Sequence, residues 1–191
     1  MGRRDVVRNL EFSHTRYRLC IAASDVDELV ASAGGWMYDR IQAGWDVSVT
    51  IAEPRDLRPL QILGATTVVT EHGFESLNNR GGTAAIAFAS EAFDHNELLR
   101  GEVLKALEQA GTEVTIWGAT IPNQLEGRIH RLQHRLSLAA RAFKAHAVAA
   151  APIPAADISA TEDLYSSAPW YGASADGYDT HRLAAGERED R

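Results

Sequence analysis

Five short apolar segments, separated by stretches with helical periodicity, constrain this chain more than any other feature of its sequence. The segments are residues 17–23, 45–52, 65–70, 83–89 and 112–118. They are rich in β-branched or small apolar residues, and most show no clean alternation of polar and apolar positions. Strands covered on both faces have this character, because neither face meets water. We therefore expect five buried strands.

Helical periodicity fills the gaps between these strands. It covers three segments, residues 26–41, 57–63 and 99–110. Capping-box patterns precede the first, with Ser24 and Asp27, and the last, with Asp94 and Glu97. Strands and helices in alternation are typical of right-handed crossovers. We predict an α/β fold with a doubly wound, mainly parallel five-stranded sheet, in the three-layer architecture of flavodoxin-like and Rossmann-like proteins.

The predicted α/β domain covers residues 17–150 and follows an N-terminal segment of residues 1–16. One stretch within it has two interpretations. Residues 71–82 contain little apolar material, so they form either a short helical crossover or a plain loop with an antiparallel return of the next strand.

The last third of the chain divides sharply by charge. Residues 122–148 carry a narrow apolar stripe at spacings of three and four, which predicts one long amphipathic helix. Five cations and one acid fall within residues 119–150, whereas residues 151–191 hold eight acids and three arginines. The second segment is also small and polar in composition, and it predicts a mostly disordered acidic tail. An aromatic island within it includes Tyr165, Trp170 and Tyr171.

Charge and composition argue against several classes of protein. The net charge is −7, which disfavours nucleic acid and anionic membranes as partners. Cys20 is the single cysteine, so no internal disulfide forms, and its apolar neighbours indicate a buried structural thiol. No apolar run approaches the ~18 residues of a membrane-spanning helix, and the first residues do not resemble a secretory signal. We expect a cytoplasmic location.

A ligand site is expected at the carboxyl edge of the strands, because doubly wound sheets bind ligands there. Polar side chains follow each predicted strand at that edge. His95 is the histidine best placed for proton transfer, and Asp25 is the second candidate catalytic residue. The candidate ligand-binding residues are Ser24, Glu53, Ser90 and Asn123.

The common fingerprints for phosphate and metal are missing or incomplete. The turn after the first strand, residues 22–28, has no glycine and carries several acids, so it is unsuited to a pyrophosphate. Asp25, Asp27 and Glu53 could hold Mg²⁺ if their loops converge, but acids at a helix start have a simpler explanation in the helix dipole. We predict no resident metal, and the sequence identifies no cofactor.

The acids after the first strand resemble the metal-binding cluster of response-regulator receivers. The third strand ends at Thr70 and Glu71 without a phospho-acceptor aspartate, and the fifth ends at Trp117 and Gly118 without the expected lysine. These departures argue against a working phospho-receiver.

Two further residue pairs have the spacing of a ligand site, but each is better explained by an ordinary structural role. His130 and His134 stand one helical turn apart, as zinc ligands do, but arginines surround them and a solvated helix face is favoured. Gly34 and Gly35 fall too far into the first helix to form a phosphate turn, and they indicate close helix–sheet packing.

Three hypotheses of function remain. The leading one is a non-catalytic regulatory or interaction protein, whose basic helix and aromatic tail bind a protein partner or a second copy. Its contact residues would be Arg128, Arg131, Arg135, Tyr165, Trp170 and Tyr171. The alternatives are an enzyme that binds a small molecule or nucleotide at the strand edge, and weak nucleic-acid binding through the three arginines.

Overall fold

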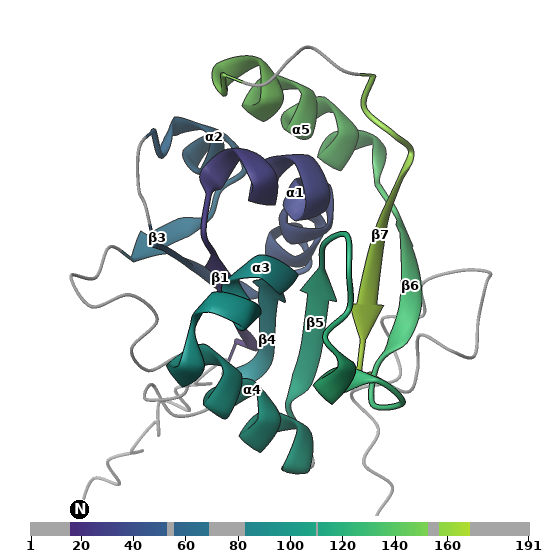
Figure 1. Cartoon of the computed structure of the whole chain (residues 1–191). Helices are drawn as coiled ribbons and strands as arrows, with labels where there is room; N and C mark the ends of the chain where they lie inside the picture. Colours follow the sequence, from purple (N-terminus) through teal and green to yellow (C-terminus); the bar gives the residue numbers. More distant parts are fainter. Residues whose placement is uncertain (1–15, 53–55, 69–82, 110, 153–156, 169–191) are drawn as a thin grey trace, which may run out of the picture.

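A seven-stranded sheet forms the centre of the molecule, with strand order β3–β2–β1–β4–β5–β7–β6 (Figure 1). This computed structural model describes residues 16–52, 56–68, 83–109, 111–152 and 157–168. The strands are β1 (Arg18–Ala23), β2 (Asp46–Ile51), β3 (Thr66–Val68), β4 (Thr83–Ala89), β5 (Glu113–Trp117), β6 (His130–Arg135) and β7 (Thr161–Ser166).

Helices cover both faces of the sheet and give a three-layer α/β fold. The first layer contains α1 (Val26–Gln42), α2 (Arg58–Ile62) and α5 (Leu138–Ala150), which contact one another. The opposite layer contains α3 (Ser90–His95) and α4 (Glu97–Glu108), which pack on β4 and β5. Figure 1 shows α1 and α5 together above the sheet and α4 below it. None of the helices in the described ranges is long and apolar enough to cross a membrane.

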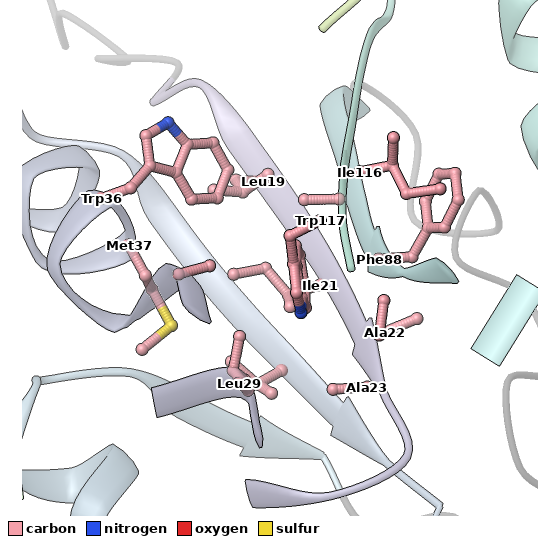
Figure 2. Packing of buried hydrophobic residues seen from close by; sticks show 14 of the residues in the cluster. Leu19, Ile21, Ala22, Ala23, Leu29, Trp36, Met37, Phe88, Ile116 and Trp117 are labelled. Carbon is pink, nitrogen blue, oxygen red and sulfur yellow. The ribbon is translucent and has the colours of Figure 1, made fainter. Parts of the chain in front are cut away.

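Strand β1 lies at the centre of the core. From Leu19 to Ala23 every residue is buried, and Cys20 is among them, as expected of a structural thiol. Figure 2 shows Trp36 and Met37 of α1 beside Leu19 and Ile21. Fully burying one large apolar side chain contributes about 1.5–3 kcal/mol, so this strand and helix supply much of the stability.

The five predicted strands are present and run parallel to one another, so the prediction of a mainly parallel sheet is confirmed in part. β1 pairs in parallel with β2 and β4, β2 with β3, and β4 with β5. The strand order reverses at β1, so the carboxyl ends of β1 and β4 form the crevice expected of a doubly wound sheet. The ambiguous residues 71–82 lie outside the described part of the chain.

The prediction that the sheet contains only five strands is wrong. Two further strands extend it beyond β5, and the sheet is mixed, because β7 runs antiparallel to both β5 and β6. Both additional strands come from the last third of the chain. Their pairing joins residues about 30 positions apart in sequence, such as Leu132 with Leu164, so no local pattern reveals it.

The predicted long helix over residues 122–148 is also wrong. This stretch forms a 3₁₀ turn, η1 (Asn123–Leu125), then β6 and then α5. Leu132, His134 and Leu136 are buried at every second position, and the residues between them are exposed. That is the period of a strand with one covered face. The apolar spacing fits both periods, and pairing with β7 decides between them.

The expectation of a disordered tail over residues 151–191 fails at residues 161–166. These residues form β7, where Glu162, Leu164 and Ser166 are buried. The strand fills the position between β5 and β6. Residues 169–191 lie outside the described residues.

Both predicted helix caps are displaced by a residue or two. Asp25, in place of Ser24, caps α1, and its Oδ1 accepts from the backbone N–H groups of Asp27 (2.7 Å) and Glu28 (3.0 Å). Asn96, in place of Asp94, caps α4, because α3 occupies the residues before it. Both corrections are local and leave the helices where the periodicity places them.

Gly34 and Gly35 allow neighbouring elements to approach the backbone of α1, which agrees with the packing interpretation. A Cβ on Gly35 would lie 2.5 Å from Leu136 Cδ2 and 3.1 Å from Glu162 Oε1. A Cβ on Gly34 would lie 3.2 Å from Leu63 Cδ1. Real Cβ atoms do not approach other atoms as closely as 2.5 Å, so a side chain at position 35 would force the buried Leu136 side chain to move.

We expect Gly35→Ala to lower the free energy of unfolding by about 1–3 kcal/mol, the usual cost of overpacking a core. Gly101→Ala on α4 is the matched control, because a Cβ there meets nothing within 4 Å. The control should be neutral or stabilising by up to ~1 kcal/mol, since alanine favours helix over glycine. Urea denaturation of both variants measures the difference, and equal effects would contradict the packing argument.

Candidate functional site

Two adjoining pockets open at the carboxyl edge of the sheet. The first, which we call the α3 pocket, has a volume of about 390 Å³ and lies between the ends of β4 and β5 and helix α3. The second, the α5 pocket, has a volume of about 460 Å³ and lies between α1, β5, β7 and α5. Glu28, Gly118 and Ala119 line both pockets, so the two form neighbouring parts of one site.

Glu28 stands between the two pockets, in the first turn of α1. Its Oε2 accepts from the indole N–H of Trp117 (3.0 Å), and its Oε1 accepts from the hydroxyl of Ser32 (3.3 Å). Burial raises the pKa of the Glu28 carboxyl, and the negative charges of Asp25 and Glu91 raise it further. The two hydrogen bonds lower the pKa, but burial outweighs them. A carboxyl tuned in this way is suited to proton transfer.

The α3 pocket brings together Ser90, Glu91, Asp94 and His95. His95 Nδ1 lies 2.8 Å from the carbonyl oxygen of Glu91. A carbonyl oxygen only accepts, so Nδ1 carries the proton, and in the neutral ring Nε2 is the acceptor. His95 is exposed and can meet a molecule in the pocket.

Gly118 shapes the floor that the two pockets share. Its φ is +135°, and a Cβ there would clash with the hydroxyl of Ser90. Both constraints exclude a side chain at the end of β5. The hydroxyl of Ser90 can therefore approach the backbone, and the space between the pockets stays open.

A buried ion pair forms one wall of the α5 pocket. Lys144 Nζ lies 2.5 Å from Glu162 Oε1 and 2.6 Å from the carbonyl oxygen of Ala31. The carboxylate of Glu162 also accepts from the backbone N–H groups of Gly35 (2.9 Å) and Trp36 (2.7 Å). α5 and β7 are thus fixed to the middle of α1 by charged groups.

The predicted site residues fall into three groups in the structure. Ser90 and His95 line the α3 pocket, as the strand-edge argument requires. Asp25 is occupied as the cap of α1, Ser24 is half-buried, and Asn123 is exposed in η1; these three line neither pocket. Glu53 lies outside the described residues.

The three arginines predicted to bind a partner do not lie on a helix. Arg128 is exposed in the loop before β6, and Arg131 and Arg135 are exposed on β6 itself. Arg131 Nη2 pairs with Asp163 Oδ1 of β7 at 3.2 Å. Tyr165 is half-buried in β7. The other two aromatic candidates, Trp170 and Tyr171, lie outside the described residues.

His130 and His134 lie on a strand and not on a helix. His134 Nε2 is 2.9 Å from Asp39 Oδ2 of α1, which makes a structural contact between β6 and the helix layer. Burial raises the pKa of the Asp39 carboxyl, but the hydrogen bonds from His134 and Ser137 outweigh it, and the net pKa is lowered. The described residues contain no group of three or more His, Cys, Asp or Glu side chains able to hold a metal ion.

Sequence reasoning missed three residues of this site: Glu28, Lys144 and Glu162. Glu28 was one of several acids after the first strand, and only the contact with Trp117, 89 positions away, distinguishes it. Lys144 and Glu162 fell in segments interpreted as a surface helix and a tail. No local signal marks Glu162, because the alternation over Glu162, Leu164 and Ser166 is one of burial in the folded sheet and not of apolar residue types.

Known proteins resemble this chain in fold. No family model and no curated protein matches its sequence. Among solved structures, the A40926 pseudoaglycone deacetylase Dbv21 matches with a TM-score of 0.51 and 15% identity, over 78% of this chain and 96% of that chain. A deacetylase in complex with teicoplanin matches with a TM-score of 0.50 and 13% identity, over 78% and 97%. The chain shares the α/β fold of these enzymes.

These comparisons contradict the hypothesis of a non-catalytic regulatory protein. The two solved structures compared above are both named as deacetylases, which are enzymes, and one of them is in complex with teicoplanin. The basic helix on which that hypothesis depended is also missing, because Arg131 and Arg135 stand on β6 and Arg128 precedes it. The alternative hypothesis, a small-molecule enzyme with a site at the strand edge, agrees better with both findings.

We expect Glu28→Gln to stabilise the protein more at pH 8 than at pH 4. A folded pKa above the ordinary value of 4.5 means that the native state gives up its proton less readily than the unfolded state. The wild-type protein therefore loses stability as the pH rises from 4.5 through the raised pKa, whereas the glutamine side chain has no proton to lose. Urea denaturation at both pH values tests this, and a difference independent of pH would contradict it.

Proposed function

We propose that this chain is an enzyme that acts on a small molecule in the α3 and α5 pockets, with Glu28 as its acid–base group. The observation that carries the proposal is the position of Glu28. Its carboxyl lies between the two pockets, at the switch point of the sheet, and burial raises its pKa. A general base works best when its pKa lies near the operating pH, and a raised pKa moves a carboxyl in that direction.

The reaction we propose is hydrolysis of an acyl bond, such as the amide of an acetylated amine. In this scheme the Glu28 carboxylate takes a proton from water as the water oxygen attacks the acyl carbon. The bond from that carbon to nitrogen then breaks, and the Glu28 carboxyl returns its proton to the leaving amine. The products are a carboxylic acid and an amine. The names of the structural neighbours support this class of reaction by analogy of fold.

His95 is the second proton-transfer residue in this proposal. Its Nδ1 is held by the Glu91 carbonyl, which leaves Nε2 as the acceptor of the neutral ring, and the residue lines the α3 pocket with Ser90. When the amine part of the substrate lies in the α3 pocket, Nε2 would take up a proton from solvent and pass it to the departing nitrogen, in place of the proton from Glu28. Its contribution is tested with His95→Gln beside the main variant.

The test is hydrolysis of 4-nitroacetanilide, which releases coloured 4-nitroaniline. We expect the wild-type protein to hydrolyse it, with kcat/KM rising as the pH passes through the raised pKa of Glu28. Glu28→Gln should lower kcat about 100-fold to 10,000-fold, the usual effect of losing a general base. Asp94→Asn, which removes another carboxyl that lines the α3 pocket, should keep most of the activity. Equal activity in the Glu28→Gln variant and the wild type would refute the proposal.

A further inference from the structure

The geometry points to Lys144 as the group that binds a carbonyl oxygen of the ligand in the α5 pocket. This inference deepens the proposed function and rests on it for the identity of the reacting bond. It starts from the donors of the lysine. An ammonium group carries three N–H donors, and within the described residues Nζ of Lys144 has two partners, the carbonyl of Ala31 and the carboxylate of Glu162. One donor remains for a molecule in the pocket.

The position of Lys144 favours such a role. The residue is only 5% exposed, yet it lines the α5 pocket together with Glu28 and Trp117. A charged donor in a largely dehydrated place forms a stronger hydrogen bond than one in water. Its contacts with Ala31 and Glu162 also fix the ammonium before any ligand arrives, so little entropy is lost on binding.

The charges around the pocket decide which kind of oxygen it takes. Glu28, Asp157, Glu162 and Asp163 line the same pocket, so carboxylates outnumber the single lysine. A ligand carboxylate or phosphate would be repelled by them. A neutral carbonyl oxygen accepts a hydrogen bond from the ammonium without that repulsion. The substrate class is therefore a neutral amide or ester, and Lys144 would also stabilise the negative charge that develops on its oxygen during hydrolysis.

A purely structural lysine would explain the ion pair but not the remaining donor at the pocket. The two roles differ in a measurable way. A structural lysine affects every ligand of the pocket alike, because it only maintains the wall. An oxygen-binding lysine affects only ligands that carry the oxygen.

The experiment compares two probes of similar shape, 4-nitroacetanilide and N-ethyl-4-nitroaniline, which lacks the carbonyl. Binding is measured by calorimetry in Glu28→Gln protein, which is expected to bind without turnover. We expect a preference for the carbonyl probe of about 10-fold or more, the usual effect of one hydrogen bond to a charged group. Adding Asp157→Asn, which removes another carboxyl that lines the pocket, should keep the preference, because Lys144 and its partner Glu162 are retained. Adding Lys144→Met together with Glu162→Gln should abolish it without leaving a buried charge unpaired.

The inference is overturned if the folded protein without Lys144 keeps the preference, or if neither probe binds. Should the variant without Lys144 fail to fold, NMR of the Lys144 ammonium nitrogen in the Glu28→Gln protein tests the inference. Its resonance should shift when 4-nitroacetanilide binds and should not shift when N-ethyl-4-nitroaniline binds. Failure of the proposed function looks different. In that case the wild-type protein does not hydrolyse 4-nitroacetanilide, although the preference that depends on Lys144 is still observed.

Discussion

The contact between the Lys144–Glu162 ion pair and the backbone of α1 is the constraint on which the rest of the site depends. It joins α5 and β7 to the middle of α1, where glycine at position 35 leaves room for the Glu162 carboxylate beside the backbone. A buried ion pair is costly unless every charge finds partners, and removing one member costs about 3–5 kcal/mol. Here the carboxylate has three donors, two of them backbone N–H groups. The pair therefore fixes the α5 pocket in a defined geometry.

The sequence predicted the part of the fold that local patterns encode. Strands β1, β4 and β5 are buried on both faces, and their continuous apolar runs identify them without knowledge of their neighbours. The last third of the chain was predicted wrongly because its structure depends on distant pairing. Residues 130–135 fit a helical stripe as well as a strand, and only β7 decides between the two. β7 itself looked like part of a polar tail because two of its six residues are acidic, and the burial of Glu162 is explained only by Lys144 and α1.

The site was predictable in its place but not in its residues. Parallel strands deliver their carboxyl ends to one edge, and this rule by itself is enough to expect Ser90 and His95 at the pocket. Several acidic residues follow β1, and the sequence does not show which of them caps the helix and which has a perturbed pKa. Asp25 points its carboxylate at two backbone N–H groups at the start of α1. Glu28, three residues later, lies beside Trp117 and is partly buried, and that difference arises from tertiary packing alone.

Fold and chemistry make separate contributions to the proposed function. The doubly wound arrangement of the parallel strands explains why a crevice exists at the edge of β1, β4 and β5, and it would do so for many reactions. The choice among those reactions depends on which charged groups the chain places in the crevice. A carboxyl with a raised pKa supplies a base, and a fixed ammonium supplies a donor for developing negative charge. Acyl hydrolysis needs both at once, because the proton leaves water while charge accumulates on the carbonyl oxygen. Glu28 and Lys144 line the same pocket from different elements of the fold, so one bound amide could contact both.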